Sequence, residues 1–314
     1  MIKDTPITLP EGKRFAFSIL DDTDDATVGN VKPLYDLLYE LGLRTTKTVW
    51  ASDCPEGSRL FFAGQTLKNN EYLEFVHELD DRNFELAWHC ATMESSKRAR
   101  TSSALDFFHS EFGYRPILHC NHGYNQENIY WGTKRYRNPL FRKIIKRVSK
   151  NQEQFEGEEE TSPYFWGDLC KKHFKFVRNF TFSGLNTLKF DPNMPYHLTD
   201  RPYVNYWFST TDVPDASHFI KLVSRKNIEQ LSNDKGICII STHLGKGYVN
   251  KGRINPDVRS TLEHLAGLNG WFVPVSEILE FLLHNKSTGQ ISRLGQLGLE
   301  WRHLVDHART RFSL

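Results

Sequence analysis

Short apolar segments that end in polar residues recur along this chain, and amphipathic segments with helical spacing separate them. The clearest apolar segments are residues 15–20 (FAFSIL) and 236–241 (GICIIS), and both are typical of buried strands. Between such segments, side chains such as Leu34, Leu37 and Leu38 fall on one face of a helix. Buried strands that alternate with amphipathic helices predict an α/β fold with a parallel sheet.

The same pattern predicts the remaining elements and the domain organisation. Strands are expected at 45–50, 84–88, 116–118, 180–182, 204–209 and 271–275, and helices at 31–41, 72–79, 97–112, 217–231, 256–268 and from 276 onward. Residues 134–160 carry a basic run followed by an acidic run and show no strand pattern. We therefore predict one domain over residues 1–284 with an inserted segment at about 134–165. The charged, helical tail at 285–314 is assigned to packing or to homo-oligomer formation.

Composition and charge limit the partners and the compartment. The 40 Lys and Arg against 38 Asp and Glu leave a net charge of +2, so the overall charge does not indicate a nucleic-acid partner. The chain starts without an apolar signal segment, and no run of about 18 apolar residues occurs, which argues against a signal peptide or a membrane span. Five cysteines without a CxxC spacing fit free thiols in a reducing compartment. We expect a cytoplasmic protein.

Four of the apolar segments end in aspartate or histidine. The residues at these ends are Asp21 and Asp22, His89, His119 with His122, and His243. Because the carboxyl ends of parallel strands gather on one face, these side chains are expected to meet there. One carboxylate with two imidazoles is a common set of ligands for catalytic zinc. The alternative for the aspartates alone is an Asp-rich turn that caps a helix.

The two adjacent aspartates are expected to have different roles. Side chains alternate in an extended segment, so Asp21 and Asp22 point in different directions. One of them would bind the metal and the other would orient or deprotonate the attacking water. A further histidine would protonate a leaving amine.

This order of elements resembles the polysaccharide deacetylase family, the nodulation-factor deacetylase-like carbohydrate esterases, from about residue 15 to residue 283. The resemblance implies an irregular (β/α)7 barrel of the glycoside hydrolase/deacetylase type. It implies that Asp21 in LDDT is the catalytic base, Asp22 a metal ligand, His89 in WHCATM a second ligand and His243 in IISTH the assisting acid. The closing GWFVPVSEILEFL is also similar to the family's last strand and helix.

The pattern departs from the family at Met93, which stands where a second histidine ligand is expected. The third ligand must therefore come from elsewhere, and the candidates are His119, His122 and Glu94. We favour His122, because its loop follows a strand end. The divergent pattern is most similar to deacetylase-type proteins of bacterial O-antigen or capsule gene clusters.

These features predict a divalent-metal hydrolase, with zinc as the expected ion, that removes an N-acyl group, most simply acetyl, from an amino sugar. The substrate would be a biosynthetic intermediate of a surface polysaccharide, either free, nucleotide-linked or lipid-linked. Candidate side chains for stacking on sugar rings are Tyr124, Trp131, Trp166 and Trp207, with core packing as the alternative for each. Candidates for holding a substrate phosphate or carboxylate are Lys246, Lys251 and Arg253, with a solvated basic loop as the alternative.

Two other functions remain open from the sequence. One is a non-catalytic carbohydrate-binding or assembly protein on the same fold. The other is a glycoside hydrolase that pairs Asp21 with a distant carboxylate such as Asp212.

Overall fold

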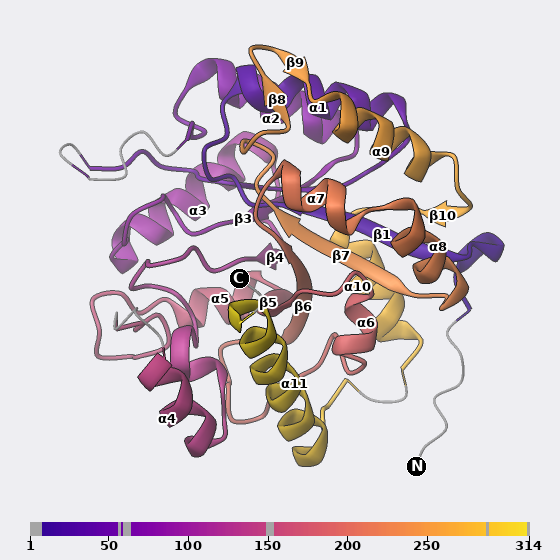
Figure 1. Ribbon diagram of the computed structural model, residues 1–314. Helices are drawn as coiled ribbons and strands as arrows, with labels where there is room; N and C mark the ends of the chain where they lie inside the picture. Colours follow the sequence, from indigo (N-terminus) through magenta and orange to yellow (C-terminus); the bar gives the residue numbers. More distant parts are fainter. Residues whose placement is uncertain (1–7, 56–57, 59–63, 149–153, 287–288, 313–314) are drawn as a thin grey trace.

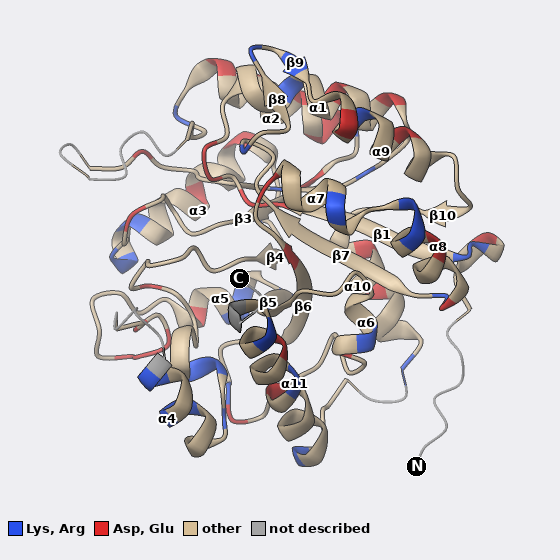
Figure 2. Ribbon diagram, in the orientation of Figure 1, with Lys and Arg blue, Asp and Glu red and all other residues tan. Residues whose placement is uncertain are grey.

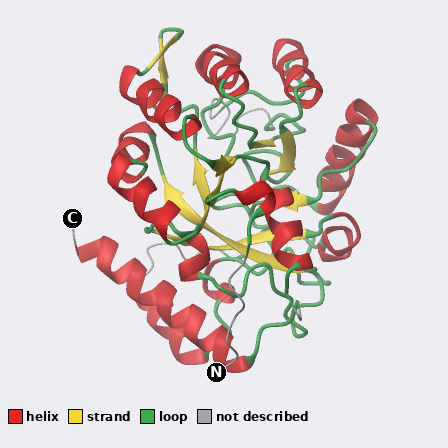
Figure 3. Cartoon of the chain, turned by 90° about the vertical axis from the view of Figure 1, so that its right-hand side faces the viewer, coloured by secondary structure: helices red, strands yellow, loops and turns green. Residues whose placement is uncertain are grey.

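The computed structural model describes residues 8–55, 58, 64–148, 154–286 and 289–312. Its centre is a closed barrel of seven parallel strands, β1 to β7, in which each strand pairs with the next and β1 pairs with β7. Helices surround the strands (Figures 1 and 3). The predicted irregular (β/α)7 barrel is therefore confirmed.

The strands are short, and their bounds follow. They are β1 (Phe15–Asp21), β2 (Thr46–Val49), β3 (Glu85–Trp88), β4 (Leu118–His119), β5 (Phe176–Phe182), β6 (Tyr206–Val213), β7 (Ile237–Thr242) and β10 (Gly270–Trp271), which pairs with the start of β1. A separate hairpin is formed by β8 (Val249–Asn250) and β9 (Arg253–Ile254).

The helices follow the strands around the barrel. They are α1 (Val28–Glu40), α2 (Asn70–Asp81), α3 (Arg98–Phe112), α4 (Pro139–Val148), α5 (Gly167–His173), α6 (Thr187–Phe190), α7 (Ala216–Leu222), α8 (Arg225–Asn233), α9 (Pro256–Ala266), α10 (Val275–His284) and α11 (Arg293–Phe312), with 3-10 turns η1 (Pro10–Gly12) and η2 (Gly132–Arg135). None of the described helices is long and apolar enough to cross a membrane.

The barrel strands are buried on both faces, which explains their uninterrupted apolar sequences. All seven residues of β1 and all six of β7 are buried. One face of each strand packs inside the barrel and the other packs under the helices. Polar residues therefore concentrate where the strands end, at the carboxyl edge of the barrel.

The largest differences between predicted and observed elements concern one helix and three strands, of which β6 ends at Val213 instead of 209. The helix expected at 217–231 is two helices, because Ser224 is extended (ψ 154°) and starts α8 as its N-cap. The last strand stops at Trp271 instead of 275, and α10 begins directly after Pro274. Strand β5 begins at Phe176, whereas the sequence predicts a strand only from 180, because the buried polar residues Arg178 and Asn179 interrupt the apolar pattern.

The C-terminal helix α11 packs against the barrel and against the segment that leads into α4. The ring of His303 lies 4.4 Å from that of Phe180, and its Nδ1 is 2.6 Å from the hydroxyl of Tyr136. Glu300 accepts hydrogen bonds from the backbone N–H groups of Arg137 and Asn138. Residues 1–7 of the predicted domain, 149–153 of the predicted insertion, and 287–288 and 313–314 of the predicted tail lie outside the described residues.

Candidate metal centre

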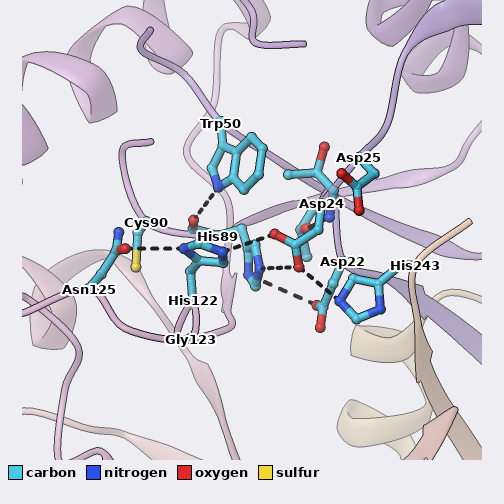
Figure 4. A network of polar contacts seen from close by, with 12 residues as sticks. Asp22, Asp24, Asp25, Trp50, His89, Cys90, His122, Gly123, Asn125 and His243 are labelled. Atoms are coloured by element: carbon cyan, nitrogen blue, oxygen red, sulfur yellow. Dashed lines mark hydrogen bonds and ion pairs between the residues drawn. The ribbon is translucent and has the colours of Figure 1, made fainter. Parts of the chain in front are cut away.

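Three imidazoles converge on the carboxylate of Asp24, in the loop after β1 (Figure 4). Asp24 Oδ1 lies 2.9 Å from Nε2 of His122, and Oδ2 lies 2.8 Å from Nε2 of His243. Nε2 of His89 is 4.0 Å from Oδ2. The histidines follow strands β3, β4 and β7, so the barrel brings together residues that are far apart in the chain.

The rings of His89 and His122 are each oriented by an oxygen at Nδ1. His89 Nδ1 is 3.0 Å from the carbonyl oxygen of Cys120, and His122 Nδ1 is 3.1 Å from Oδ1 of Asn125. This arrangement leaves Nε2 of each ring as the atom that can bind a cation. Burial would lower the pKa of His122, but the hydrogen bond with Asp24 raises it overall, so a cation there would replace the proton on Nε2. Nε2 of His89 is buried and has no hydrogen-bond partner among the described residues. This buried nitrogen faces Oδ2 of Asp24 at 4.0 Å.

Trp50 supports both rings from one side. Its indole Nε1 donates to the carbonyl oxygen of His89 at 2.9 Å. Its ring stacks on His89 at a centroid distance of 6.2 Å and meets His122 edge-on at 5.4 Å. The fully buried indole therefore restricts the orientation of the two imidazoles.

The residues fit a divalent cation. Asp24, His89 and His122 offer ligand atoms that all lie within 4.8 Å of one another. Burial lowers the pKa of His89 to about 4, so its ring is neutral at pH 7, as a metal ligand must be. Burial alone would raise the pKa of Asp24, but hydrogen bonds with His122 and His243 hold it well below its usual value. One anionic carboxylate with two imidazoles is a donor set that zinc accepts while keeping a position open.

A second carboxylate, Asp22, lies beside this cluster and pairs with an arginine. Nη1 of Arg178 is 2.9 Å from Oδ1 and 2.7 Å from Oδ2 of Asp22. Oδ1 is also 3.9 Å from Nδ1 of His89. Burial raises the pKa of Asp22, but the charge of Arg178, together with those of His89 and His243 when they are protonated, lowers it further than burial raises it. Asp22 is therefore an anion at neutral pH.

His243 is placed to carry a proton on both ring nitrogens. Its Nδ1 lies 3.1 Å from the carbonyl oxygen of Pro214, and its Nε2 faces Asp24. Both neighbours are acceptors, so each nitrogen donates. Burial would lower the pKa of His243, but the hydrogen bond to Asp24 and the charge of Asp22 raise it overall. The ring is an available acid at the edge of the cluster.

Asp21, the expected base, has both carboxylate oxygens occupied by other groups. Oδ2 accepts from Nζ of Lys47 at 2.8 Å and from the hydroxyl of Tyr35 at 2.9 Å, and Oδ1 accepts from the backbone N–H of Leu244 at 2.9 Å. The carboxylate and its lysine partner are fully buried. Asp21 thus ties the end of β1 to β2, α1 and the loop after β7. The geometry does not support the base role expected for it, nor a glycosidase mechanism that pairs it with Asp212.

No family model and no curated protein matches this sequence. Solved structures do match. The structure of a putative polysaccharide deacetylase from Mycobacterium smegmatis aligns with a TM-score of 0.54 at 13% identity, covering 91% of this chain and 96% of that one. The fold is that of the polysaccharide deacetylases. The resemblance expected from the sequence is confirmed at the level of the fold.

Two further solved structures match with lower scores. The peptidoglycan deacetylase PdaC from Bacillus subtilis is 13% identical over 87% of this chain and 92% of that chain, with a TM-score of 0.39. A putative polysaccharide deacetylase involved in O-antigen biosynthesis from Bordetella bronchiseptica is 13% identical over 96% of both chains, with a TM-score of 0.36.

Among the three candidates for the third ligand in this deacetylase-fold protein, only His122 belongs to the cluster. His119 is buried between the rings of Trp166 and Phe174, at 5.1 and 5.5 Å, and its Nε2 contacts Asn121. Glu94 is half-buried and is not among the grouped ligand atoms of the described residues. Met93 packs with Trp50 and Cys54 in a separate buried apolar cluster.

The aromatic candidates for sugar stacking divide into two groups. Trp166 and Trp207 are fully buried, so the core-packing alternative holds for both. Tyr124 is 54% exposed. Trp131 is half-exposed, donates from Nε1 to the carbonyl oxygen of Gly123, and has the guanidinium of Arg135 4.4 Å from its ring centre. Tyr124 and Trp131 share the loop that carries His122.

None of the three basic candidates forms an ion pair or a hydrogen bond with Asp24, His89 or His122 among the described residues. Lys246 is 3.4 Å from Asp25, the residue after Asp24. Arg253 is exposed on the β8–β9 hairpin, and Lys251 lies in its turn with a φ of 48°. All three side chains are thus at least partly exposed to solvent, and of the three Lys246 contacts the loop after β1 that carries Asp24.

Sequence reasoning missed Asp24 and Arg178. Asp24 belongs to the same acidic run as Asp21 and Asp22, but the catalytic and ligand roles were assigned to the adjacent pair. Arg178 interrupts the apolar pattern of β5 (FVRNFTF), and a charge in the middle of a buried strand indicates a buried ionic partner. That signal could have pointed to Arg178, but it does not identify Asp22 as its partner.

Proposed function

We propose that this protein is a divalent-metal-dependent hydrolase that removes an N-acyl group, most simply acetyl, from an amino sugar. The observation that carries the proposal is the buried Nε2 of His89, which has no hydrogen-bond partner among the described residues and faces Asp24 beside the Asp22–Arg178 pair. Nδ1 of the core residue His119 also has no hydrogen-bond partner among the described residues, but Nε2 of His89 differs from it because it faces a carboxylate and belongs to a group of convergent ligand atoms. The protonated ring of His243 completes a set of ligands, base and acid.

Asp24, His89 and His122 would hold the ion, for which zinc is the expected choice. When bound, a divalent cation supplies Lewis acidity toward the amide carbonyl and toward water. Asp22 accepts a proton from the attacking water, and Arg178 keeps Asp22 ionised until then. His243 donates the proton on Nε2 to the nitrogen that leaves. The water oxygen joins the carbonyl carbon, the C–N bond breaks, and the products are a carboxylate and a free amine.

Two residues of this proposal differ from those expected from the sequence. The base is Asp22 in place of Asp21, and the carboxylate ligand is Asp24 in place of Asp22. The reason is physical: Asp21 already satisfies three buried donors, and Asp22 is engaged with Arg178. His89, His122 and His243 keep their expected roles.

The substrate we propose is an amino sugar in an intermediate of surface-polysaccharide synthesis. Tyr124 and Trp131 lie in the loop of His122 and offer faces for stacking on sugar rings. Lys246 lies close enough to the site loop to contact an anionic group on the substrate. The five cysteines are free and buried, which supports the cytoplasmic location expected from the sequence.

The proposal is tested with zinc-loaded protein and N-acetylated oligosaccharides. Released acetate and new primary amines are measured, and new reducing ends are measured in the same samples. We expect acetate and amine in equal amounts and no reducing ends. Asp22→Asn should abolish release, whereas Asp25→Asn, a matched change at an exposed neighbour that has a φ of 59°, should retain it. Reducing ends without acetate would favour the glycosidase, and failure to bind zinc or release acetate would favour the binding protein.

A further inference from the structure

Helices α4 and α11 together expose an unusual share of the large hydrophobic side chains. Of the nine such side chains exposed among the described residues, five belong to these two helices. They are Leu140 (61% exposed), Ile144 (41%), Leu294 (82%), Leu297 (41%) and Trp301 (57%). A cluster of this kind marks an interaction surface more often than isolated exposed residues do.

The exposed residues lie on one face of each helix, and the two helices are in contact. Leu294, Leu297 and Trp301 follow the i, i+3, i+7 spacing of one helix face, and Leu140 and Ile144 follow the i, i+4 spacing. The ring of Trp301 lies 6.1 Å from that of Phe141, the neighbour of Leu140. Glu300, which binds the backbone just before α4, holds the two helices in a fixed relation. We call this surface the α4–α11 face.

The charges on the α4–α11 face are basic. Helix α4 contains four cationic residues, all exposed, and no acidic residue: Arg142, Lys143, Lys146 and Arg147 (Figure 2). On α11, Glu300 is buried and Asp306 bonds to Ser183, while Arg293 and Arg309 are exposed. The face therefore combines apolar and positively charged side chains.

The acidic residues 158–160, which the structure describes, do not pair with α4. Glu158 and Glu159 both pair with Lys134, each at 2.7 Å. Glu160 accepts a hydrogen bond from the hydroxyl of Tyr203. These three acids have partners outside α4, so they leave the positive charge of the helix uncompensated.

We propose that the α4–α11 face docks onto an anionic lipid bilayer. Basic amphipathic helices with exposed leucine and tryptophan bind at the boundary between head groups and acyl chains, and their cations attract anionic lipids. A second copy of this chain is the less suitable occupant, because a symmetric interface would bring two basic faces together. This surface lies outside the residues of the proposed reaction, so the inference does not depend on that function.

The test is co-sedimentation of the full chain with vesicles, in the absence of substrate. We expect binding to phosphatidylcholine–phosphatidylglycerol vesicles, little binding to phosphatidylcholine vesicles, and release by added salt. Lys143→Gln/Lys146→Gln should weaken binding about 30-fold, since each cation near an anionic membrane contributes about one kcal/mol. The matched control Lys221→Gln/Lys226→Gln removes the same charge from exposed positions on α7 and α8 and should change binding less than about twofold.

The apolar part of the face is tested separately. Trp301→Ser and Leu294→Ser should each reduce vesicle binding, and Leu294 is so exposed that its replacement leaves the packed core intact. Sedimentation velocity gives the oligomeric state of the same samples. Absence of binding to anionic vesicles, or equal losses in the matched control, overturns the proposal. If the protein does not bind vesicles and forms a dimer that Trp301→Ser dissociates, the occupant of the face is instead a second copy of the chain.

Discussion

Arg178, in the middle of β5, donates from one guanidinium nitrogen to both carboxylate oxygens of Asp22, at 2.9 and 2.7 Å, across the inside of the barrel. The side chains are only 6% and 9% exposed, so water screens their attraction weakly. The pair connects β5 with the end of β1, two strands that are not neighbours in the sheet. It keeps a buried carboxylate ionised where the proposed reaction needs a base.

Replacement of this arginine should shift the pH profile of the reaction. Arg178 lowers the pKa of Asp22, so Arg178→Gln should raise that pKa and move the acidic limb of kcat/KM to higher pH. Arg178→Lys, which retains the charge, should restore part of the shift. The measurement is acetate release against pH for the three proteins. A lower rate with an unmoved acidic limb would show that Arg178 acts only on structure.

Zinc content should distinguish Asp24 from its neighbours. Asp24→Asn and His122→Ala each remove a proposed ligand and should weaken zinc binding at least about 100-fold. Asp22→Asn should keep zinc while losing activity, because Asp22 is engaged with Arg178. Elemental mass spectrometry of the purified proteins gives the zinc per chain. Loss of zinc in Asp22→Asn with retention in Asp24→Asn would restore the assignment expected from the sequence.

The Asp21–Lys47 pair should behave as a structural unit. Asp21→Asn leaves the fully buried ammonium of Lys47 without its counter-charge and should cost about 3–5 kcal/mol of unfolding free energy. Asp21→Asn/Lys47→Met removes both charges and should cost less than the sum of the single changes. Denaturant unfolding of the four proteins gives the coupling energy. Additive single costs would contradict a coupled pair.

The stability of the protein should fall as the pH rises through the range in which Glu127 titrates. Glu127 is fully buried, accepts from Ser96 N–H and from Asn125, and burial raises its pKa to about 7. Between about pH 4.5 and 7 the folded protein holds this proton and the unfolded chain has lost it, so the free energy of unfolding decreases with pH. The full loss is roughly 3 kcal/mol and is complete above pH 7.

Glu127→Gln provides the matched control for this titration, because it has no proton to lose. The difference in unfolding free energy between wild type and variant should change by about that amount from pH 5 to pH 8, whatever the constant effect of the substitution. Urea unfolding at several pH values measures it. A constant difference would show that Glu127 is ionised throughout in the folded protein.

The sequence by itself determined the class of fold. Apolar runs such as residues 15–20 and 236–241 identify strands that are buried on both faces, because such strands have no polar side to alternate. The positions of His89 and His243, each directly after an apolar segment, also predict that both lie at the carboxyl edge of the barrel. These features are local, so one sequence is enough to reveal them.

Only the tertiary structure decided which aspartate faces which partner. Asp21, Asp22 and Asp24 lie within four residues of one another, but their partners Lys47, Arg178 and His122 come from other strands and loops. Charge and spacing in the acidic run do not carry that information, because it depends on how β1, β2 and β5 close around the barrel. In the same way, the α4–α11 face exists only because two helices about 160 residues apart in the chain lie side by side.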